Sequence, residues 1–434
     1  METNDSKLTK ELLLPVINCI TNKKLDEALE LLNQLEQRYE EDIIFKFKGS
    51  IFLKKKKWKE SINNYEKYLK KNNNKFDGYY NIGIAYFNLG QLSKAIDNFK
   101  ISLNHNKENI QKYESLGITY KLIGDYEQSI KYYLLGLNLN TSHLRIVQNL
   151  IDTFNYYKPN NIKNYIIKIN HQILKIGNKL NNQKIIRKEN ILNLLEKSNQ
   201  LVNQNKTELA YFETQIFRKN KTNLNCKRHL SIFKNNKIIP KFCFDCFKVQ
   251  IKLNNVIELI FLFFYFNKLK LRNNNIRKCM VETRANVQGN YKGYIYCSGI
   301  DEAREILNQV NKDIKKYNII FDKIEIKHGC TEYYKEYNLF ESIKDNSVNS
   351  IYKKDWKNIE KKFDEENFTI ENNKERIFNS TINQYNLSDF LIIKNWLIYA
   401  KLTGDETYKQ IFKSDLKINF LGNILKNQIE IRKN

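Results

Sequence analysis

Three glycines recur at a spacing of 34 residues, each in the same local sequence frame: Gly49, Gly83 and Gly117. This period is typical of stacked units that each contain two helices joined by a turn. About three such units are needed before a stack becomes stable. The spacing therefore predicts an all-α superhelix in the first third of the chain.

The residues around each glycine also repeat. Around Gly83 they are the aromatic or aliphatic Tyr79, Ile82, Tyr86 and Phe99 and the small Ala95. On this pattern, residues 41–140 resemble the tetratricopeptide repeat family, and we expect diverged units on either side. The resemblance implies a superhelix over residues 1–175, with a concave face lined by the first helix of each unit.

The face of each first helix that points away from the packing residues predicts a binding surface. Its side chains are Lys46, Ser50, Leu53, Asp77, Tyr80, Ile84, Phe87, Glu114, Ile118 and Lys121. Several are apolar although the stack does not require it, which favours a groove for a peptide or a partner helix. The alternative is that this face packs against the chain's own C-terminal region.

The net charge of +25 is concentrated in the middle of the chain, with about +20 between residues 156 and 335. A basic middle favours an anionic partner such as RNA, an anionic lipid or an acidic protein, and the alternative is a solvated basic surface.

The longest apolar run, residues 256–266, is shorter than the roughly 20 residues of a membrane span. The N-terminus lacks the pattern of a secretion signal, so we expect a cytoplasmic protein without a transmembrane segment.

Three of the seven cysteines and one of the five histidines fall within a short segment. The residues are Cys226, His229, Cys243 and Cys246, which suit a structural, tetrahedral Zn²⁺ site. A redox C-x-x-C motif and an iron–sulfur site that draws on Cys279 or Cys297 are alternatives. The remaining interpretation is buried thiols beside a histidine that plays no metal-binding role.

The segments after Cys246 alternate between strand-like and helix-like patterns. They predict strands at 247–253, 276–284, 291–298 and 319–327, with helices at 255–270 and 301–317. The order βαββαβ is that of a ferredoxin-like module. Residues 292–298 and the following helix also resemble the RNA-recognition motif. That resemblance implies base stacking on Tyr294 and Tyr296, with Lys292 beside them.

The sequence thus predicts a multi-domain chain. Its parts are a repeat superhelix (1–175), a basic helical linker (176–222), a Cys/His cluster with an α+β module (223–335) and a helical C-terminal region (336–434). No phosphate-binding loop and no hydrolase or metalloprotease motif is present. We therefore favour a non-catalytic scaffold that binds a protein or peptide partner. The alternatives are an RNA-binding protein and a redox or metal enzyme at the C-x-x-C.

Overall fold

The computed structural model describes residues 8–70, 76–181, 187–204, 209–285, 287–317, 321–337, 340, 352–367, 375–412, 416, 418 and 420–433. The chain forms two compact units. The first is Met1–His143 together with Glu365–Ile377, and the second is Leu144–Asp364 together with Phe378–Asn434. The first unit therefore ends earlier than the predicted superhelix, and the second contains most of the predicted linker and C-terminal region.

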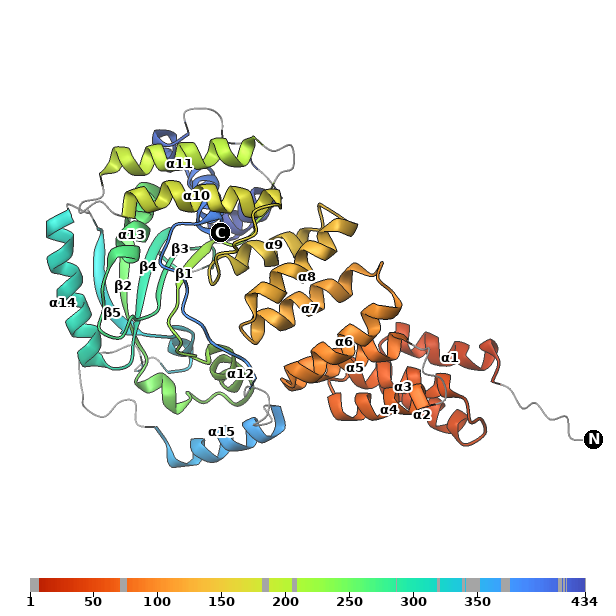
Figure 1. Ribbon diagram of the computed structural model, residues 1–434. Coiled ribbons are helices and arrows are strands. Elements are labelled where there is room, and N and C mark those ends of the chain that lie inside the picture. The colour runs from red at the N-terminus through yellow and green to blue at the C-terminus, as the bar shows by residue number, and fades with distance from the viewer. Residues whose placement is uncertain are drawn as a thin grey trace, which may run out of the picture. The chain divides into compact units, whose positions relative to one another are not determined.

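Antiparallel helix pairs build the first unit (Figure 1). The helices are α1 (Lys10–Thr21), α2 (Leu25–Glu36), α3 (Asp42–Lys54), α4 (Trp58–Lys70), α5 (Phe76–Leu89), α6 (Leu92–His105), α7 (Ile110–Leu122) and α8 (Tyr126–Leu139). Each odd-numbered helix packs against the even-numbered helix that follows it, and consecutive pairs stack. This is the helix–turn–helix repeat that the glycine spacing predicts.

The repeated glycines are explained by an aromatic ring on the second helix of each pair. The pairs are Gly49 with Tyr65, Gly83 with Phe99, and Gly117 with Tyr133. A Cβ atom added at Gly83 would lie 2.6 Å from the Phe99 ring, closer than carbon atoms approach without rearrangement. Only glycine lets the two helices meet at this distance.

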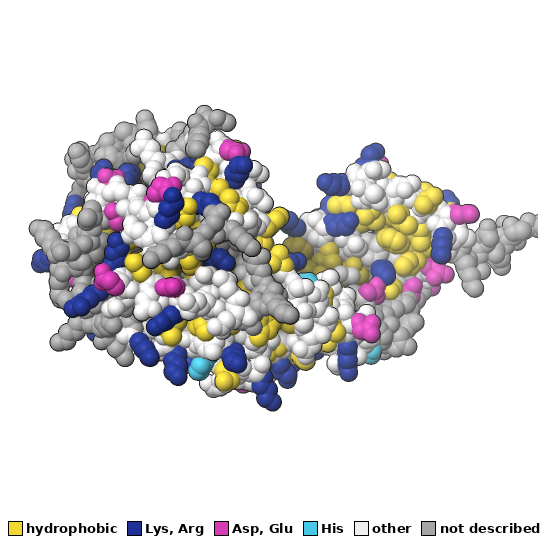
Figure 2. All heavy atoms as spheres, turned by 90° about the horizontal axis from the view of Figure 1, so that it is seen from above, with side chains coloured by type: hydrophobic (Ala, Val, Ile, Leu, Met, Phe, Trp, Pro, Cys, Tyr) yellow, Lys and Arg dark blue, Asp and Glu magenta, His cyan; other side chains and the backbone are white. Residues whose placement is uncertain are grey.

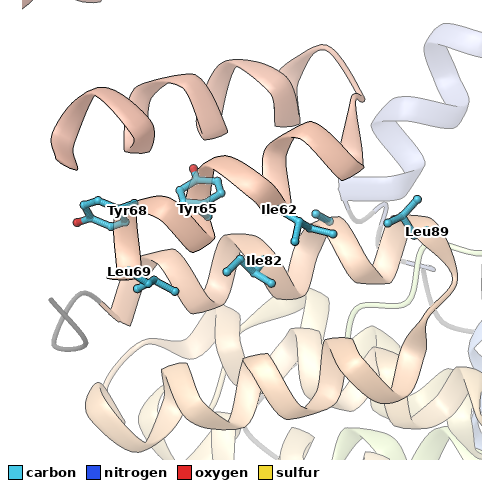
Figure 3. Close-up of a cluster of buried hydrophobic side chains, with 7 residues drawn as sticks. Ile62, Tyr65, Tyr68, Leu69, Ile82 and Leu89 are labelled. Atoms are coloured by element: carbon cyan, nitrogen blue, oxygen red, sulfur yellow. The ribbon is translucent and has the colours of Figure 1, made fainter. Parts of the chain in front are cut away.

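The interior between repeat units is filled by side chains from neighbouring pairs. Figure 3 shows one such cluster, in which residues of α4 face residues of α5: Ile62, Tyr65, Tyr68, Leu69, Ile82 and Leu89. All six are buried. Because each cluster joins successive pairs, the unit has a continuous apolar core along its length.

An antiparallel sheet lies at the centre of the second unit, with strand order β1-β3-β4-β2-β5. The strands are β1 (Gln215–Arg218), β2 (Phe247–Leu253), β3 (Arg277–Val281), β4 (Tyr291–Cys297) and β5 (Lys323–His328). Helix α13 (Val256–Lys268) connects β2 to β3, and α14 (Ile300–Tyr317) connects β4 to β5. From β2 onward the elements follow the order βαββαβ, and β1 adds an edge strand.

One face of this sheet is covered by helices. A Cβ atom added at Gly293 would overlap Leu262 of α13, so the odd-numbered residues of β4 point toward that helix. The even-numbered residues, Tyr294 among them, point to the opposite face. Helices α13 and α14 both contact the sheet, as Figure 1 shows.

The predicted linker is part of this unit. Helices α9 (Leu144–Thr153), α10 (Tyr165–Asn181) and α11 (Lys188–Asn203) precede β1, and α11 buries Leu194 and Leu195. Residues 176–222 thus supply core side chains and strand β1. A basic segment can do so because its charged residues stand at other positions than its buried apolar residues.

The C-terminal region is helical, as predicted, but it is not a separate domain. Its helices are α15 (Lys354–Asn367), α16 (Leu387–Thr403) and α17 (Phe420–Lys433). A further helix of the second unit, α12 (Cys226–Asn236), lies between β1 and β2 in the sequence. Helix α16 is buried along most of its length, and its Trp396 donates to the Thr214 carbonyl oxygen at 2.8 Å. Among the described residues, no helix combines the length and apolar character that crossing a membrane requires.

Candidate functional site

The predicted binding surface lies on α3, α5 and α7, the first helices of three pairs. We call it the helix-A face: Lys46, Ser50, Leu53, Asp77, Tyr80, Ile84, Phe87, Glu114, Ile118 and Lys121. Asp77 is exposed, Glu114 is buried, and the others are half-buried. The surface is therefore partly apolar and only partly open to solvent.

The apolar centre of the helix-A face comes from α5. Tyr80, Ile84 and Phe87 pack against the buried cluster formed by α6 and α7, but each stays partly exposed. The Tyr80 hydroxyl lies 3.1 Å from Ser115 Oγ on the next unit. These side chains therefore stabilise the stack while presenting aromatic and aliphatic surface, and Ser115 is a neighbour that the sequence did not indicate.

An ion pair joins two neighbouring first helices at the edge of this apolar centre. Lys46 of α3 pairs with Asp77 of α5, and the two side chains are 39% and 44% exposed. The Tyr68 hydroxyl donates to Asp77 Oδ1 at 3.3 Å. Burial, followed by the Asp77 charge, raises the pKa of Tyr68 to about 12. Tyr68 therefore keeps its proton and remains a hydrogen-bond donor.

A segment from late in the chain contacts the first unit near its turns. The backbone N–H of Ser93 donates to Glu375 Oε2 at 2.6 Å, and the N–H of Ile377 donates to the Leu122 carbonyl oxygen at 2.9 Å. Ser93 and Leu122 lie at helix ends, outside the helix-A face. The alternative interpretation is that C-terminal residues cover the helix-A face. These two contacts involve residues outside that face, so they do not by themselves cover it.

The second candidate site contains four cysteines, which we call the thiol cluster: Cys226, Cys243, Cys246 and Cys330. Cys243 and Cys246 are buried, Cys226 is exposed and Cys330 is half-buried. Burial is the main cause that raises the pKa of Cys243 to about 12, where the Tyr333 hydrogen bond opposes it, and the pKa of Cys246 to about 11, where Cys226 adds to it. Burial and the other three thiols raise the pKa of Cys330. An attacking thiolate needs the opposite shift, which weighs against redox catalysis here.

His229 lies on α12, one turn after Cys226. Its ring stacks on Phe242 at 5.1 Å between centroids. Burial, followed by the Arg228 charge, lowers its pKa to about 4, and the other charged groups acting on it are Glu360 and Asp364 of α15. The C-x-x-H spacing indicated His229, and the structure also brings Cys330 toward the other cysteines. As the side chains stand, no three His, Cys, Asp or Glu of the described residues are arranged to hold a metal ion.

The sheet face that the RNA-recognition resemblance singled out is largely covered. Tyr294 is 4% exposed, and Lys292 is 2% exposed and pairs with Glu282 at 2.9 Å. Tyr296 is half-buried. Base stacking needs an open ring face, so the structure lends no support to RNA binding through Tyr294. Cys279 lies on the opposite face, because it is paired with Gly293.

A small polar pocket that the sequence did not indicate lies in the second unit. It measures about 230 Å³, and its lining includes Asp152, Tyr211, Glu213 and Lys219. Burial, followed by the charge of Asp152, raises the pKa of Glu213. The full lining comes from three separate segments of the sequence, 152–156, 211–219 and 381–392, which is why no local motif reveals the pocket.

Comparisons with known proteins identify the repeats. Residues 49–90 match the model described as TPR repeat, and residues 113–143 match the model described as Tetratricopeptide repeat. No curated protein matches this chain.

Solved structures similar to the chain include two of MamA and one of YrrB. The crystal structure of MamA is 17% identical over 32% of this chain and 82% of its own, with a TM-score of 0.31. The structure described as YrrB, "a TPR protein with an unusual peptide-binding site", is 16% identical over 30% and 69%, with a TM-score of 0.29. MamA from Desulfovibrio magneticus RS-1 is 20% identical over 32% and 78%, with a TM-score of 0.30. Residues 49–90 and 113–143 thus match tetratricopeptide repeat models, and they lie within the stacked helix pairs α3–α8.

Proposed function

We propose that this chain is a protein-interaction scaffold whose helix-A face binds an extended peptide segment of a partner protein. The observation that carries the proposal is the half-exposed apolar centre at Tyr80, Ile84 and Phe87, beside the Lys46–Asp77 pair. Aromatic side chains that neighbours already hold in place supply contact area at low entropic cost. The adjacent charges supply the orientation and specificity that apolar contacts lack.

We also propose that the second unit contains a ferredoxin-like module. Support comes from the βαββαβ order and from the position of β2 between β4 and β5. Cytoplasmic location remains a prediction from the sequence.

Selection from a random-peptide phage library on the immobilised full chain tests the binding proposal. We expect enriched peptides to bind Asp77→Lys at least about tenfold more weakly, because the change reverses a charge on the helix-A face. Asp97→Lys is the matched control, since the same charge reversal then falls on the exposed side of α6. It should leave affinity within about twofold, as expected for a charge change remote from an interface.

Two results would overturn the proposal. One is the absence of any peptide enriched over the bare support. The other is an equal loss of affinity in both variants while circular dichroism shows both folded. The second result would place peptide binding outside the helix-A face.

A further inference from the structure

The thiol cluster brings together residues from three distant parts of the second unit. Cys226 is the first residue of α12, Cys243 lies in the short 3-10 helix Lys241–Phe244, and Cys246 directly precedes β2. Cys330 follows the end of β5. Strands β2 and β5 are neighbours, with Phe247 paired to His328, so Cys246 and Cys330 stand at the same end of the sheet.

Close backbone contacts hold two of these segments together. The N–H of Gly329 donates to the Cys246 carbonyl oxygen at 2.8 Å. A Cβ atom added at Gly329 would overlap Cys246 Sγ, so the glycine allows the chain that carries Cys330 to lie directly against that sulfur. A side chain at this position would force Cys330 away from Cys246.

Tyr333 connects the remaining segments. Its hydroxyl lies 3.2 Å from Cys243 Sγ, and it also interacts electrostatically with Cys330. Its ring meets Phe233 of α12 edge to face at 4.7 Å between centroids, which fixes the helix that begins with Cys226. A hydroxyl donor beside thiol sulfurs is the kind of outer hydrogen bond that orients metal ligands.

The charge surrounding the cluster suits a metal bound by thiolates. Lys248 is buried, Lys278 is half-buried, and both interact electrostatically with Cys226. Four thiolates around one divalent cation carry a net charge of about −2. The two ammonium groups would offset that charge, while Glu332 is an acidic group that acts on both lysines and on Cys226.

We propose that Cys226, Cys243, Cys246 and Cys330 bind one Zn²⁺ as a tetrahedral four-thiolate site, and that His229 is not a ligand. Binding replaces four S–H bonds by four Zn–S bonds and releases four protons to solvent. Binding requires the four sulfurs to move together, because the described side chains are not at ligand spacing as they stand. The site would tie α12 and the segment after β5 to the end of the sheet. It is independent of peptide binding by the helix-A face.

Zinc content of the full chain, purified without chelator, tests the proposal. We expect about one zinc per chain, and a sulfur-to-metal charge-transfer absorption when Co²⁺ replaces zinc. Cys226→Ser should abolish both without unfolding the protein, because this cysteine is exposed. Cys330→Ser should abolish both as well. His229→Gln and Cys19→Ser should retain both, since Cys19 lies in the repeat region.

Alkylation under native conditions gives a readout that does not require a variant. In the metal-loaded chain the exposed Cys226 should react at least about tenfold more slowly than after treatment with a chelator, because the metal-bound thiolate is withdrawn from reaction. The proposal is overturned if the wild-type chain binds neither Zn²⁺ nor Co²⁺. It is also overturned if His229→Gln loses the metal while Cys330→Ser keeps it, or if a chelator leaves Cys226 reactivity unchanged.

Discussion

Single residues set the geometry of the repeat turns. Gly90 and Gly124 end the first helices of two pairs with φ of 77° and 82°, in the left-handed region that glycine tolerates. Lys56 occupies the same slot one repeat earlier and adopts φ of 60°. A side chain in this region costs roughly 1 kcal/mol. The three turns therefore share one backbone conformation, although the residue at this position is lysine in one repeat and glycine in the other two.

Lys56→Gly should stabilise the first unit by about 0.5–1 kcal/mol, because glycine removes that cost but adds freedom to the unfolded chain. Gly90→Ala should destabilise it by a similar amount for the opposite reason. Chemical denaturation followed by circular dichroism measures both. A destabilising Lys56→Gly would show that the lysine side chain contributes more than its strained backbone costs.

At the scale of elements, one buried ion pair ties β1 to α16. Arg218 donates to both carboxylate oxygens of Asp389, at 3.0 and 2.7 Å, and both side chains are almost completely buried. Asp389 also caps the start of α16 through Asn386. Burial raises the pKa of Asp389, and Arg218 opposes that rise. The pair therefore positions a core helix against the edge of the sheet.

Asp389→Asn should destabilise the second unit by about 3–5 kcal/mol, because it leaves Arg218 charged and buried without its carboxylate. The double change Arg218→Gln with Asp389→Asn should cost less than the sum of the single changes. Glu406→Gln breaks an exposed pair with Lys409 and should change stability by less than about 0.5 kcal/mol. Additive costs at Arg218 and Asp389 would contradict this account.

The sequence predicted the elements better than their assembly. The glycine period and the strand–helix alternation predicted α3–α8 and the order from β2 to β5, because these patterns are local. It did not predict that residues 176–222 and most of residues 336–434 join one unit. The contacts responsible, such as Arg218 with Asp389 or Trp396 with Thr214, join residues too far apart for any local pattern to reveal.

The candidate sites show the same limit. The helix-A face follows from helical periodicity, whereas its contacts with Ser115 and Tyr68 depend on how units stack. Local spacing pointed to His229 for the thiol cluster. The pairing of β2 with β5 also brings Cys330 to Cys246, and sheet pairing cannot be read from a C-x-x-H motif.

For the whole molecule, acid should weaken the second unit in part through His229. Its pKa is about 4 in the folded chain against an ordinary value of 6.5, so the unfolded chain takes up a proton first. The free energy of unfolding therefore decreases as pH falls from 6.5 to 4. His229→Gln should show a smaller loss of Tm than wild type across this range, with chelator present throughout. His105→Gln, in the repeat region, should match wild type, and an unchanged pH dependence in His229→Gln would refute the assignment.

The central claim is that the first helices of the repeat region bind the partner. Amide hydrogen exchange of the full chain, with and without a selected peptide, tests it most directly. We predict slower exchange in α5 and α7, Phe76–Leu89 and Ile110–Leu122, with little change in α6 and α8. Protection confined to the second unit, with α5 and α7 unchanged, would contradict the account.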